Sequence, residues 1–285
     1  MKTKLPLIFV VIIIWLTNFF QGNAQTQSIC EGALKTYTVN GPGSGPVGST
    51  YNWSLVGANA GNYAGTTNLS AQTANAITIN WASTPAGTYT LQVIETNNSC
   101  EGDPVTLTIV ITAPPVAGTI SGTQEVCTGA TTTFAVSGNS ASGTWSSSDT
   151  NVATVNASGE VTAVGAGTAT ISYTVLGTGG CTDAVATRTV TVTNPPIAGT
   201  ISGTQEVCTS NTTTFTIAGN SAPGIWSSSN TNVATVSTSG VVTAVAPGSA
   251  TITYTVAGSG GCSDATTTRV VNVNAVPVTS PIQFD

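Results

Sequence analysis

The sequence predicts an all-β protein made of three tandem β-sandwich domains that follow a cleaved leader segment. Three observations support this prediction. Short runs alternate apolar and polar residues, clusters of Gly, Ser, Asn and Thr separate these runs, and a long internal repeat covers the second and third parts of the chain. No segment after residue 24 has a sustained helical period. The pattern therefore favours strands and turns.

The chain begins with a predicted secretory signal peptide over residues 1–24. Lys2 and Lys4 precede a largely apolar run over residues 5–20, and small residues up to Ala24 form a signal peptidase site. The run is shorter than the roughly 20 residues that span a bilayer as a helix, so we expect cleavage after Ala24 rather than an uncleaved anchor. This predicts export through the inner membrane and a secreted or cell-surface protein.

Two copies of one segment follow each other in the chain, because residues 118–192 align without a gap on residues 199–273. Each copy begins with GTISGTQEVCT, and a Pro-Pro pair precedes each copy. Pro-Pro pairs favour extended, semi-rigid polyproline geometry, so we expect the domains to follow one another as a rod. The predicted domains are residues 25–113, 114–194 and 195–274, with a tail over residues 275–285.

Inside the repeat, apolar residues recur at every second position, as in strands with one buried face. Turn residues interrupt these runs at 156–159 and 177–180. Six or seven short strands in a unit of about 80 residues indicate an antiparallel β-sandwich. In the first copy the expected strands lie at residues 132–136, 152–155, 161–164, 168–175 and 188–192.

The chain has 6 cysteines, an even number in a protein predicted to reach an oxidising compartment, so we expect disulfides. Each predicted domain contains two cysteines, which suggests pairing within each domain. Metal binding is the alternative, but no CxxC pair and no histidine accompanies the cysteines. The expected disulfides are Cys30–Cys100, Cys127–Cys181 and Cys208–Cys262.

Charge and composition exclude several classes of function. With 5 Lys+Arg against 11 Asp+Glu and a net charge of −6, the chain lacks the basic clusters that nucleic-acid binding requires. It has no histidine, which excludes Ser-His-Asp and Cys-His catalysis. Glu101 with Asp103, or Asp149 near Asp183, carry no signature of a paired-carboxylate or calcium site. We therefore expect no enzyme, no cofactor and no metal site.

The repeat carries an ordered set of motifs: a tryptophan before a serine run, then VATV, then a glycine two residues before VTAV, then ATI after a glycine. This order resembles the bacterial immunoglobulin-like (Ig-like) domain of group 2. The resemblance implies an Ig-like β-sandwich that acts as a spacer, an adhesin stalk or a carbohydrate- or protein-binding module. The motifs lie at residues 145–155, 158–164 and 167–171 in the first copy, and at 226–236, 239–245 and 248–252 in the second.

The first domain has different motifs, with Cys-Glu-Gly at residues 30–32, Tyr-Asn-Trp-Ser at 51–54 and Gly-Thr-Tyr-Thr-Leu at 87–91. These motifs resemble the PKD-like domains of cell-surface and secreted proteins of Bacteroidetes. Such proteins include gliding and adhesion proteins that the type IX secretion system exports. The resemblance therefore implies the same group of roles and an export machinery as one partner.

Aromatic residues supply the remaining candidate sites. Trp145 and Trp226 occupy equivalent repeat positions, and we expect them to anchor the core from a central strand. In the first domain, Tyr51, Tyr63 and Tyr89 are the candidates for exposed aromatics that contact a ligand. If these tyrosines are exposed, a carbohydrate-binding protein is the alternative to a passive stalk.

The sequence thus predicts a non-catalytic, secreted or cell-surface structural or adhesion module made of Ig-like domains. The alternatives are a carbohydrate-binding surface protein and an exported protein associated with gliding or with the type IX system. The expected partners are a surface glycan or protein and the export machinery, without nucleic acid. Unpaired strand edges also favour self-association by strand addition.

Overall fold

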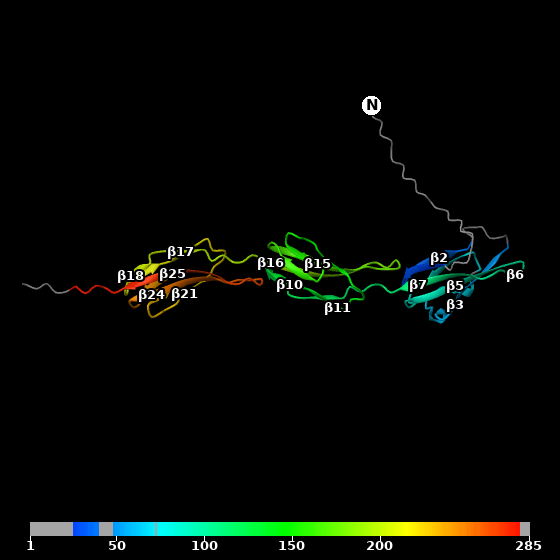
Figure 1. Cartoon of the computed structure of the whole chain (residues 1–285), viewed down its shortest axis with the longest axis horizontal. Coiled ribbons are helices and arrows are strands. Elements are labelled where there is room, and N and C mark those ends of the chain that lie inside the picture. The colour runs from blue at the N-terminus through cyan, green and yellow to red at the C-terminus, as the bar shows by residue number, and fades with distance from the viewer. Residues whose placement is uncertain (1–24, 40–47, 72, 280–285) are drawn as a thin grey trace, which may run out of the picture. The chain divides into compact units, whose positions relative to one another are not determined.

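The computed structural model describes residues 25–39, 48–71 and 73–279 (Figure 1). The predicted signal peptide and the end of the predicted tail lie outside these described residues. Within them the chain forms strands joined by turns, and the only helical elements are two single-turn 3-10 helices, η1 (Ala60–Asn62) and η2 (Leu69–Ala71). No helix in this described part is long and apolar enough to cross a membrane. The all-β prediction is confirmed.

The buried side chains gather in three separate hydrophobic clusters. We call the strands around these clusters the first sandwich (25–112), the second sandwich (119–193) and the third sandwich (200–274). These limits follow the strands that surround each core. The domain boundaries expected from the sequence stay a prediction.

By their contacts, the residues group into two compact units. The first unit consists of Met1–Pro114 with the short segment Thr178–Cys181, and the second consists of Pro115–Gly177 with Thr182–Asp285. Thr178–Cys181 therefore belongs to the unit that contains the first sandwich, whereas the residues on both sides of it in the sequence belong to the second unit.

The first sandwich consists of a larger and a smaller sheet. Its strands are β1 (Gln25–Cys30), β2 (Leu34–Thr38), β3 (Thr50–Val56), β4 (Ala76–Asn80), β5 (Gly87–Asn97), β6 (Cys100–Glu101) and β7 (Val105–Thr112). The larger sheet has the order β1-β7-β5-β3, with β6 paired to β5, and the smaller sheet pairs β2 with β4. Ile79, Trp81 and Ile109 are fully buried, so side chains from both sheets form the core.

The second sandwich consists of three sheets. Its strands are β8 (Thr119–Ser121), β9 (Glu125–Cys127), β10 (Thr131–Thr133), β11 (Ala135–Ser137), β12 (Thr144–Ser147), β13 (Ala153–Val155), β14 (Glu160–Ala163), β15 (Gly167–Val175) and β16 (Ala184–Thr193). The sheet orders are β12-β15-β16-β9, β10-β14-β13 and β11-β8. The strands expected at 152–155, 161–164, 168–175 and 188–192 are present, within a few residues at their ends. The single strand expected at 132–136 is wrong, because the chain breaks at Phe134 into β10 and β11, which belong to different sheets.

The third sandwich repeats this arrangement. Its strands are β17 (Thr200–Ser202), β18 (Glu206–Cys208), β19 (Thr212–Thr214), β20 (Thr216–Ala218), β21 (Ile225–Ser228), β22 (Ala234–Val236), β23 (Val241–Ala244), β24 (Gly248–Val256) and β25 (Ala265–Asn274). The sheet orders are β18-β25-β24-β21, β19-β23-β22 and β17-β20. The sequence duplication is thus a structural duplication.

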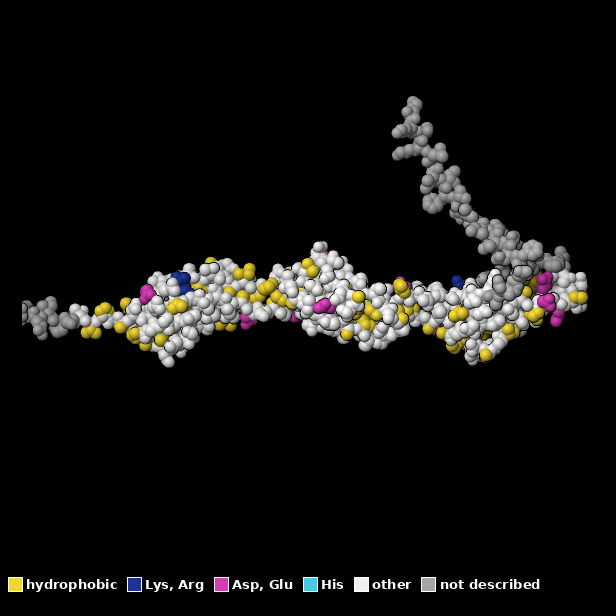
Figure 2. Space-filling model, in the orientation of Figure 1, with side chains coloured by type: hydrophobic (Ala, Val, Ile, Leu, Met, Phe, Trp, Pro, Cys, Tyr) yellow, Lys and Arg dark blue, Asp and Glu magenta, His cyan; other side chains and the backbone are white. Residues whose placement is uncertain are grey.

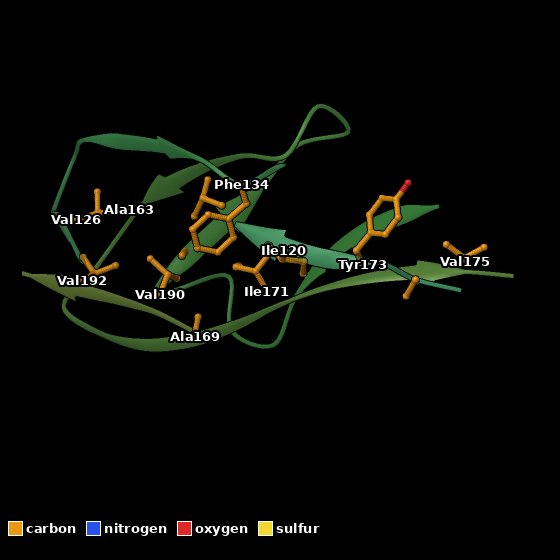
Figure 3. Packing of buried hydrophobic residues seen from close by; sticks show 13 residues of the cluster. Ile120, Val126, Phe134, Ala163, Ala169, Ile171, Tyr173, Val175, Val190 and Val192 are labelled. Atoms are coloured by element: carbon orange, nitrogen blue, oxygen red, sulfur yellow. The ribbon is translucent and has the colours of Figure 1, made fainter. Parts of the chain in front are cut away.

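The core of the second sandwich shows how the alternating pattern becomes packing (Figure 3). On β15, every second residue is buried, namely Ala169, Ile171, Tyr173 and Val175. The residues between them are threonines and a serine that face outward. Phe134, with 1% of its surface exposed, joins the same cluster from the segment between β10 and β11.

One strand pair in each sandwich is parallel, which corrects the expectation of a purely antiparallel fold. β1 pairs with β7, β9 with β16 and β18 with β25 in parallel register. In the second sandwich the chain adds β8 to one sheet, crosses at Gly122, and then adds β9 to another. Gly122 has a φ of +132°, and a Cβ there would lie 2.6 Å from the Phe134 ring. The GTISGTQEVCT segment therefore encodes a change of sheet that requires glycine.

An arginine in each repeat holds this crossing in place. Arg269 donates hydrogen bonds to the carbonyl oxygen of Gly203 at 2.8 and 3.1 Å and to that of Ile201 at 3.3 Å. Its guanidinium lies 5.8 Å from the centre of the Phe215 ring. Arg188 makes the matching contacts in the second sandwich through its two terminal nitrogens and its approach to Phe134, whereas its buried Nε has no hydrogen-bond partner among the described residues. Both arginines thus act in the fold.

Replacing Arg269 by alanine should therefore destabilise the third sandwich by about 1.5–3 kcal/mol, the usual range for hydrogen bonds to a charged group. Urea denaturation followed by circular dichroism measures this loss. Arg269→Lys keeps the charge but not the planar fork of donors, so it should recover only part of the stability. Full recovery by lysine would mean that charge alone, and not the fork, holds the crossing.

Trp145 and Trp226 are half-buried and pack against the cores of their sandwiches. Their rings lie 4.9 Å from Tyr173 and 4.8 Å from Tyr254, measured between ring centres. Both tryptophans lie on edge strands, β12 and β21. The expected core contact is present, but the expected central strand is wrong.

Candidate functional site

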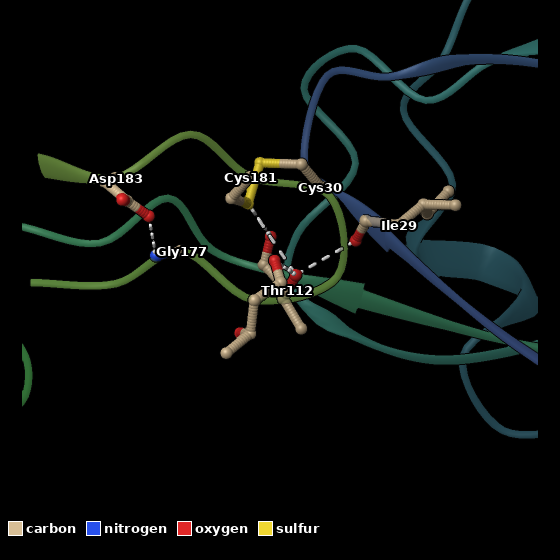
Figure 4. Close-up of a disulfide and its surroundings, with 7 residues drawn as sticks. Ile29, Cys30, Thr112, Gly177, Cys181 and Asp183 are labelled. Atoms are coloured by element: carbon tan, nitrogen blue, oxygen red, sulfur yellow. Dashed lines mark hydrogen bonds between the residues drawn. A yellow bond between two sulfur atoms is a disulfide. The ribbon is translucent and has the colours of Figure 1, made fainter. Parts of the chain in front are cut away.

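The first disulfide connects the end of β1 to the tip of the hairpin between β15 and β16 (Figure 4). Cys30 is bonded to Cys181, and their Cα atoms lie 4.7 Å apart. The Thr112 hydroxyl lies 3.1 Å from the Ile29 carbonyl oxygen and 3.0 Å from the Thr178 carbonyl oxygen. The Cys181 sulfur lies 3.5 Å from the Thr112 carbonyl oxygen. Polar contacts thus surround the covalent bond.

The second disulfide repeats this geometry. Cys127, at the end of β9, is bonded to Cys262 at the tip of the hairpin between β24 and β25, with a Cα–Cα distance of 4.7 Å. The Cys262 sulfur lies 3.4 Å from the Thr193 carbonyl oxygen. The Thr128 amide donates to this same oxygen at 2.9 Å. The same junction geometry therefore occurs twice along the chain.

We call the strand end that carries Cys30, Cys127 or Cys208 a dock, and the hairpin turn that carries Cys100, Cys181 or Cys262 a tip. Each dock ends a strand that pairs in parallel with the last strand of its sandwich. Each tip lies on the connection that leads into that last strand. Each sandwich thus has one dock and one tip.

The third dock has the same backbone geometry but an unbonded cysteine. Cys208 is free and exposed. The Thr209 amide donates to the Asn274 carbonyl oxygen at 2.9 Å, as the Thr128 amide does to Thr193 at the same distance. Asn274 stands opposite Cys208 in the register, in the place that Thr193 has in the second sandwich.

A carboxylate lies beside the third dock. Glu206 accepts hydrogen bonds from the side-chain amides of Asn272 at 2.7 Å and Asn274 at 2.9 Å. The bonds from Asn272 and Asn274 lower the pKa of the Glu206 carboxyl below its usual value, because they favour the charged form. Glu206 therefore keeps its negative charge to a lower pH than a free glutamate.

The tip of the first sandwich also has an unbonded cysteine, because Cys100 is free and exposed. Two residues with positive φ precede it, Asn98 at +49° and Ser99 at +66°. A bonded tip has the same backbone, with Gly179 at +63° and Gly180 at +81°. Consecutive positive φ values are typical of a type I′ hairpin turn. The free tip therefore shares this two-residue turn with the bonded tips, although Cys100 begins β6 whereas Cys181 and Cys262 lie outside the strands.

The cysteine pairing expected from the sequence is wrong. In the second sandwich, Cys127 lies opposite Thr193 at the end of β16, whereas Cys181 precedes the start of β16. A strand of this length spans about 30 Å, and a disulfide needs Cα atoms within about 7 Å. The disulfides connect successive sandwiches instead, so they replace the expected pairs Cys30–Cys100, Cys127–Cys181 and Cys208–Cys262.

A variant with both Cys127→Ser and Cys262→Ser should have a less stable third sandwich. While the second sandwich is folded, Cys127 is held opposite Thr193, so the bond closes the loop from Thr193 to Cys262, a separation of 69 residues. The chain-entropy model gives about 4 kcal/mol for such a loop, and measured losses are typically about 2–4 kcal/mol. Urea denaturation measures the change, with Cys208→Ser as the neutral control. Equal midpoints for the double variant and the wild type would contradict the prediction.

The tyrosines expected at the surface belong to the first core instead. Tyr51 and Tyr89 have 4% and 2% of their surface exposed. Tyr63 is half-buried, donates its hydroxyl to the Asn80 carbonyl oxygen at 3.0 Å and packs edge-on against Trp81. Tyr51 and Tyr89 occupy inward positions of β3 and β5, which the alternation along each strand dictates. These rings do not form an exposed platform for a sugar.

A groove with a volume of about 560 Å³ opens on the first sandwich along β1, β2 and β7. Tyr37, Trp53 and Leu107 contribute apolar surface, and Gln25 and Thr36 contribute polar atoms. No Asp, Glu, Lys, Arg or Cys is among the residues that line it. Its titratable side chain is Tyr37, whose hydroxyl oxygen accepts a hydrogen bond from Trp81 Nε1 at 3.2 Å.

Asp149 and Asp183 each bond to the backbone of their own turn rather than to each other. Asp183 accepts a hydrogen bond from the Gly177 amide at 2.9 Å, just outside the tip (Figure 4). Asp149 accepts one from the Asn151 amide at 2.9 Å. Across the described ranges, no group of three or more His, Cys, Asp or Glu side chains could hold a metal ion.

Two segments of the chain, residues 107–185 and 184–268, match the model of the bacterial Ig-like domain (group 2). Together they cover more than half of the 285 residues. The chain belongs to the bacterial Ig-like (group 2) family. Each group 2 match contains one dock cysteine and one tip cysteine. The group 2 resemblance is confirmed, whereas the PKD-like resemblance of the first sandwich stays a prediction.

Solved structures similar to this group 2 chain include mouse cadherin-23 EC22-24, with 15% identity, coverage of 90% of this chain and 98% of that one, and a TM-score of 0.33. Invasin, a bacterial integrin-binding protein, has 14% identity, 80% and 52% coverage and a TM-score of 0.37, so this chain spans about half its length. A 282-residue fragment of intimin, in complex with the intimin-binding domain of its translocated receptor, has 18% identity, 62% and 66% coverage and a TM-score of 0.35. No curated protein matches the chain.

Proposed function

We propose that this chain is a non-catalytic structural or adhesion module, exported to the cell surface or the medium, whose Ig-like sandwiches are covalently joined to their neighbours. The observation that carries the proposal is the bonding pattern. Each disulfide uses a dock cysteine of one sandwich and a tip cysteine of the next one along the chain.

This bonding pattern limits how far the chain can be stretched. The two disulfides bridge overlapping segments, with sequence separations of 151 and 135 residues. The shortest covalent route from Cys30 to Cys262 crosses both disulfides and uses only residues 127–181. Even in the unfolded chain, Cys30 and Cys262 cannot separate by more than the length of this route. This limit suits a module that transmits mechanical load between a cell and a surface.

The compartment that we propose fits these bonds and the surface. Disulfides form and persist outside the reducing cytosol. Only 6% of the residues are charged, and Figure 2 shows a face made mostly of uncharged atoms with scattered acidic and basic side chains. Uncharged polar surfaces of Thr, Ser and Asn, together with the disulfides, support export rather than a cytosolic role.

The more specific alternatives have different support. The carbohydrate-binding alternative rested on the tyrosines Tyr51, Tyr63 and Tyr89, which lie in the first core. Export by the type IX system rests on the sequence motifs of the first domain alone. We therefore propose the structural or adhesion role, and leave the surface glycan or protein that it contacts as a class of partner.

Cell fractionation combined with intact mass spectrometry tests the proposal. We expect a mature chain that starts at Gln25, in the outer-surface or medium fraction. On reduction, its mass should rise by the mass of four hydrogen atoms if each chain carries the two observed disulfides. A chain that retains residues 1–24 in the inner membrane, with all its thiols free, would refute the proposal.

A further inference from the structure

We infer that copies of this chain link head to tail through a disulfide between Cys100 of one copy and Cys208 of the next. The partner is a second copy of the chain. This inference goes beyond the proposed function, because it follows from the recurring junction and does not depend on where the protein is exported or what it adheres to.

The first step of the argument is the open dock. In all three sandwiches, the residue after the dock cysteine donates its amide to the last strand at 2.9 Å, through Glu31, Thr128 and Thr209. The cysteines of the first two docks are half-buried and bonded. Cys208 has the same backbone setting but is exposed and unbonded. The third dock therefore has the backbone arrangement of the bonded docks, but its cysteine has no disulfide partner within the described chain.

The second step is the open tip. Cys181 and Cys262 each follow two left-handed residues, are half-buried and are bonded. Cys100 follows two left-handed residues as well, but it is exposed and unbonded. The strand β6 fixes this tip, because Cys100 pairs with Asn97 in the β5–β6 register. The first sandwich therefore presents a tip that is ready to join a dock.

These two open halves are complementary. A dock joins a tip in both observed junctions, and the described chain retains one dock and one tip. A second copy supplies a tip for the open dock at Cys208, or a dock for the open tip at Cys100. Because the two joined surfaces differ, the contact is heterologous and leaves one open dock and one open tip after each addition. The product is an open chain of copies rather than a closed dimer.

The open halves differ from the bonded ones at two residues that would meet. A Cβ at Gly260 would lie 2.8 Å from the Thr193 Cβ, so the bonded tips need glycine there. The free tip has Asn98 at this place, and the free dock has Asn274 in place of Thr193. The bonded Cα atoms lie only 4.7 Å apart, near the lower end of the range of about 4.4–6.8 Å for disulfides. The junction can therefore widen to admit Asn98 and still form its bond.

The bond forms by thiol–disulfide exchange with an oxidant of the disulfide class, such as oxidised glutathione. The Cys208 thiolate attacks oxidised glutathione, forms a mixed disulfide and releases one reduced glutathione. The Cys100 thiolate of another copy then attacks the Cys208 sulfur and releases a second reduced glutathione. In total, the two protein thiols give up two electrons and two protons and form one disulfide. One glutathione disulfide takes up these electrons and protons and becomes two thiols.

Both halves carry negative charge close to the cysteine. Glu101 follows Cys100 directly, and Figure 2 shows acidic atoms gathered at the end of the first sandwich that carries β6. Glu206 lies beside the open dock. Their repulsion opposes the encounter and is screened by salt. Linkage should therefore be faster at higher ionic strength.

The test uses the purified mature chain in a glutathione redox buffer, analysed on non-reducing gels. The wild type should form a ladder of multiples that reductant collapses. Cys100→Ser alone and Cys208→Ser alone should remain monomeric. An equimolar mixture of these two variants should form at least about ten-fold more dimer than either alone, because docking raises the effective concentration of the two thiols. One partner carries a mass tag, and peptide mapping should recover Cys100 linked to Cys208.

Three outcomes would overturn the inference. The first is a wild type that stays monomeric, whether its thiols remain free or bond within one chain. The second is homodimer formation by each single variant at the rate of the mixture, which would indicate random thiol oxidation. The third concerns Asn98→Gly, which restores the glycine of the bonded tips at a positive φ. This variant should accelerate linkage, and an unchanged rate would show that the tip does not enter the dock in the observed geometry.

Discussion

Pulled from its two ends in oxidising buffer, the unfolded chain should stop extending when Cys30 and Cys262 are about 190 Å apart, at about 3.5 Å per extended residue. Only residues 127–181 lie on the shortest covalent route when both disulfides are intact. After reduction, the whole segment between Cys30 and Cys262 extends, and the same two residues should separate to about 800 Å. Single-molecule force spectroscopy with handles at the two ends measures both limits.

The double variant Cys127→Ser/Cys262→Ser makes this experiment specific for the observed pairing. With Cys30–Cys181 as its remaining disulfide, the route runs over residues 181–262 and the limit should rise to about 280 Å. Pairing within each sandwich would allow the same limit of about 190 Å for the wild type, but about 570 Å for the double variant. A double variant that reaches this longer limit would therefore refute the observed junctions.

The positions of the strands could be predicted from the sequence because they depend on local pattern. On β15 the alternation from Ala169 to Val175 places every second residue in the core, and the neighbouring glycines and prolines mark the turns. The parallel pairing of β9 with β16 could not be predicted in this way. It depends on the crossing at Gly122 between two sheets, which the alternating pattern does not reveal.

The pairing of the cysteines is also a property of the whole fold. Counting two cysteines in each domain favours pairing within the domain, because short loops close more easily. The strand β16 overrides this preference, because it holds Cys127 and Cys181 near its opposite ends. A signal was nevertheless present in the sequence. In both repeats, one cysteine ends the second short strand and the other precedes the last long strand, which already places them far apart.

The tyrosines show where composition alone misleads. Tyr51 and Tyr89 were candidates for ligand contact because tyrosine combines an apolar ring with a polar hydroxyl. Their hydroxyls instead bond within the sandwich, where Tyr89 donates to the Pro85 carbonyl oxygen at 2.9 Å. Both lie at positions of β3 and β5 that alternate with exposed or half-buried residues. The alternation of buried and more exposed residues along β3 and β5 therefore places both rings in the core.

Replacing Phe215 by alanine should cause the largest loss of stability among single substitutions in the third sandwich, about 3–5 kcal/mol. Phe215 is fully buried in the third cluster. Its ring closely approaches the backbone at Gly203, where a Cβ would lie 2.7 Å from the ring. The surrounding side chains cannot collapse into the space that alanine leaves, because the backbone of the sheet crossing forms one wall of it and Arg269 holds that wall in place.

A loss of this size is a large part of the total stability of a small domain, which is about 5–15 kcal/mol. The third sandwich of Phe215→Ala should therefore unfold well before the second, and Phe134→Ala should reverse this order, because Phe134 occupies the equivalent place. Urea denaturation followed by the fluorescence of Trp145 and Trp226 separates the two sandwiches when each tryptophan is replaced in turn by phenylalanine. Phe215→Leu, which retains most of the apolar volume, should lose less. If alanine and leucine lost equally little, the ring would not be the element that joins the sheet crossing to the core.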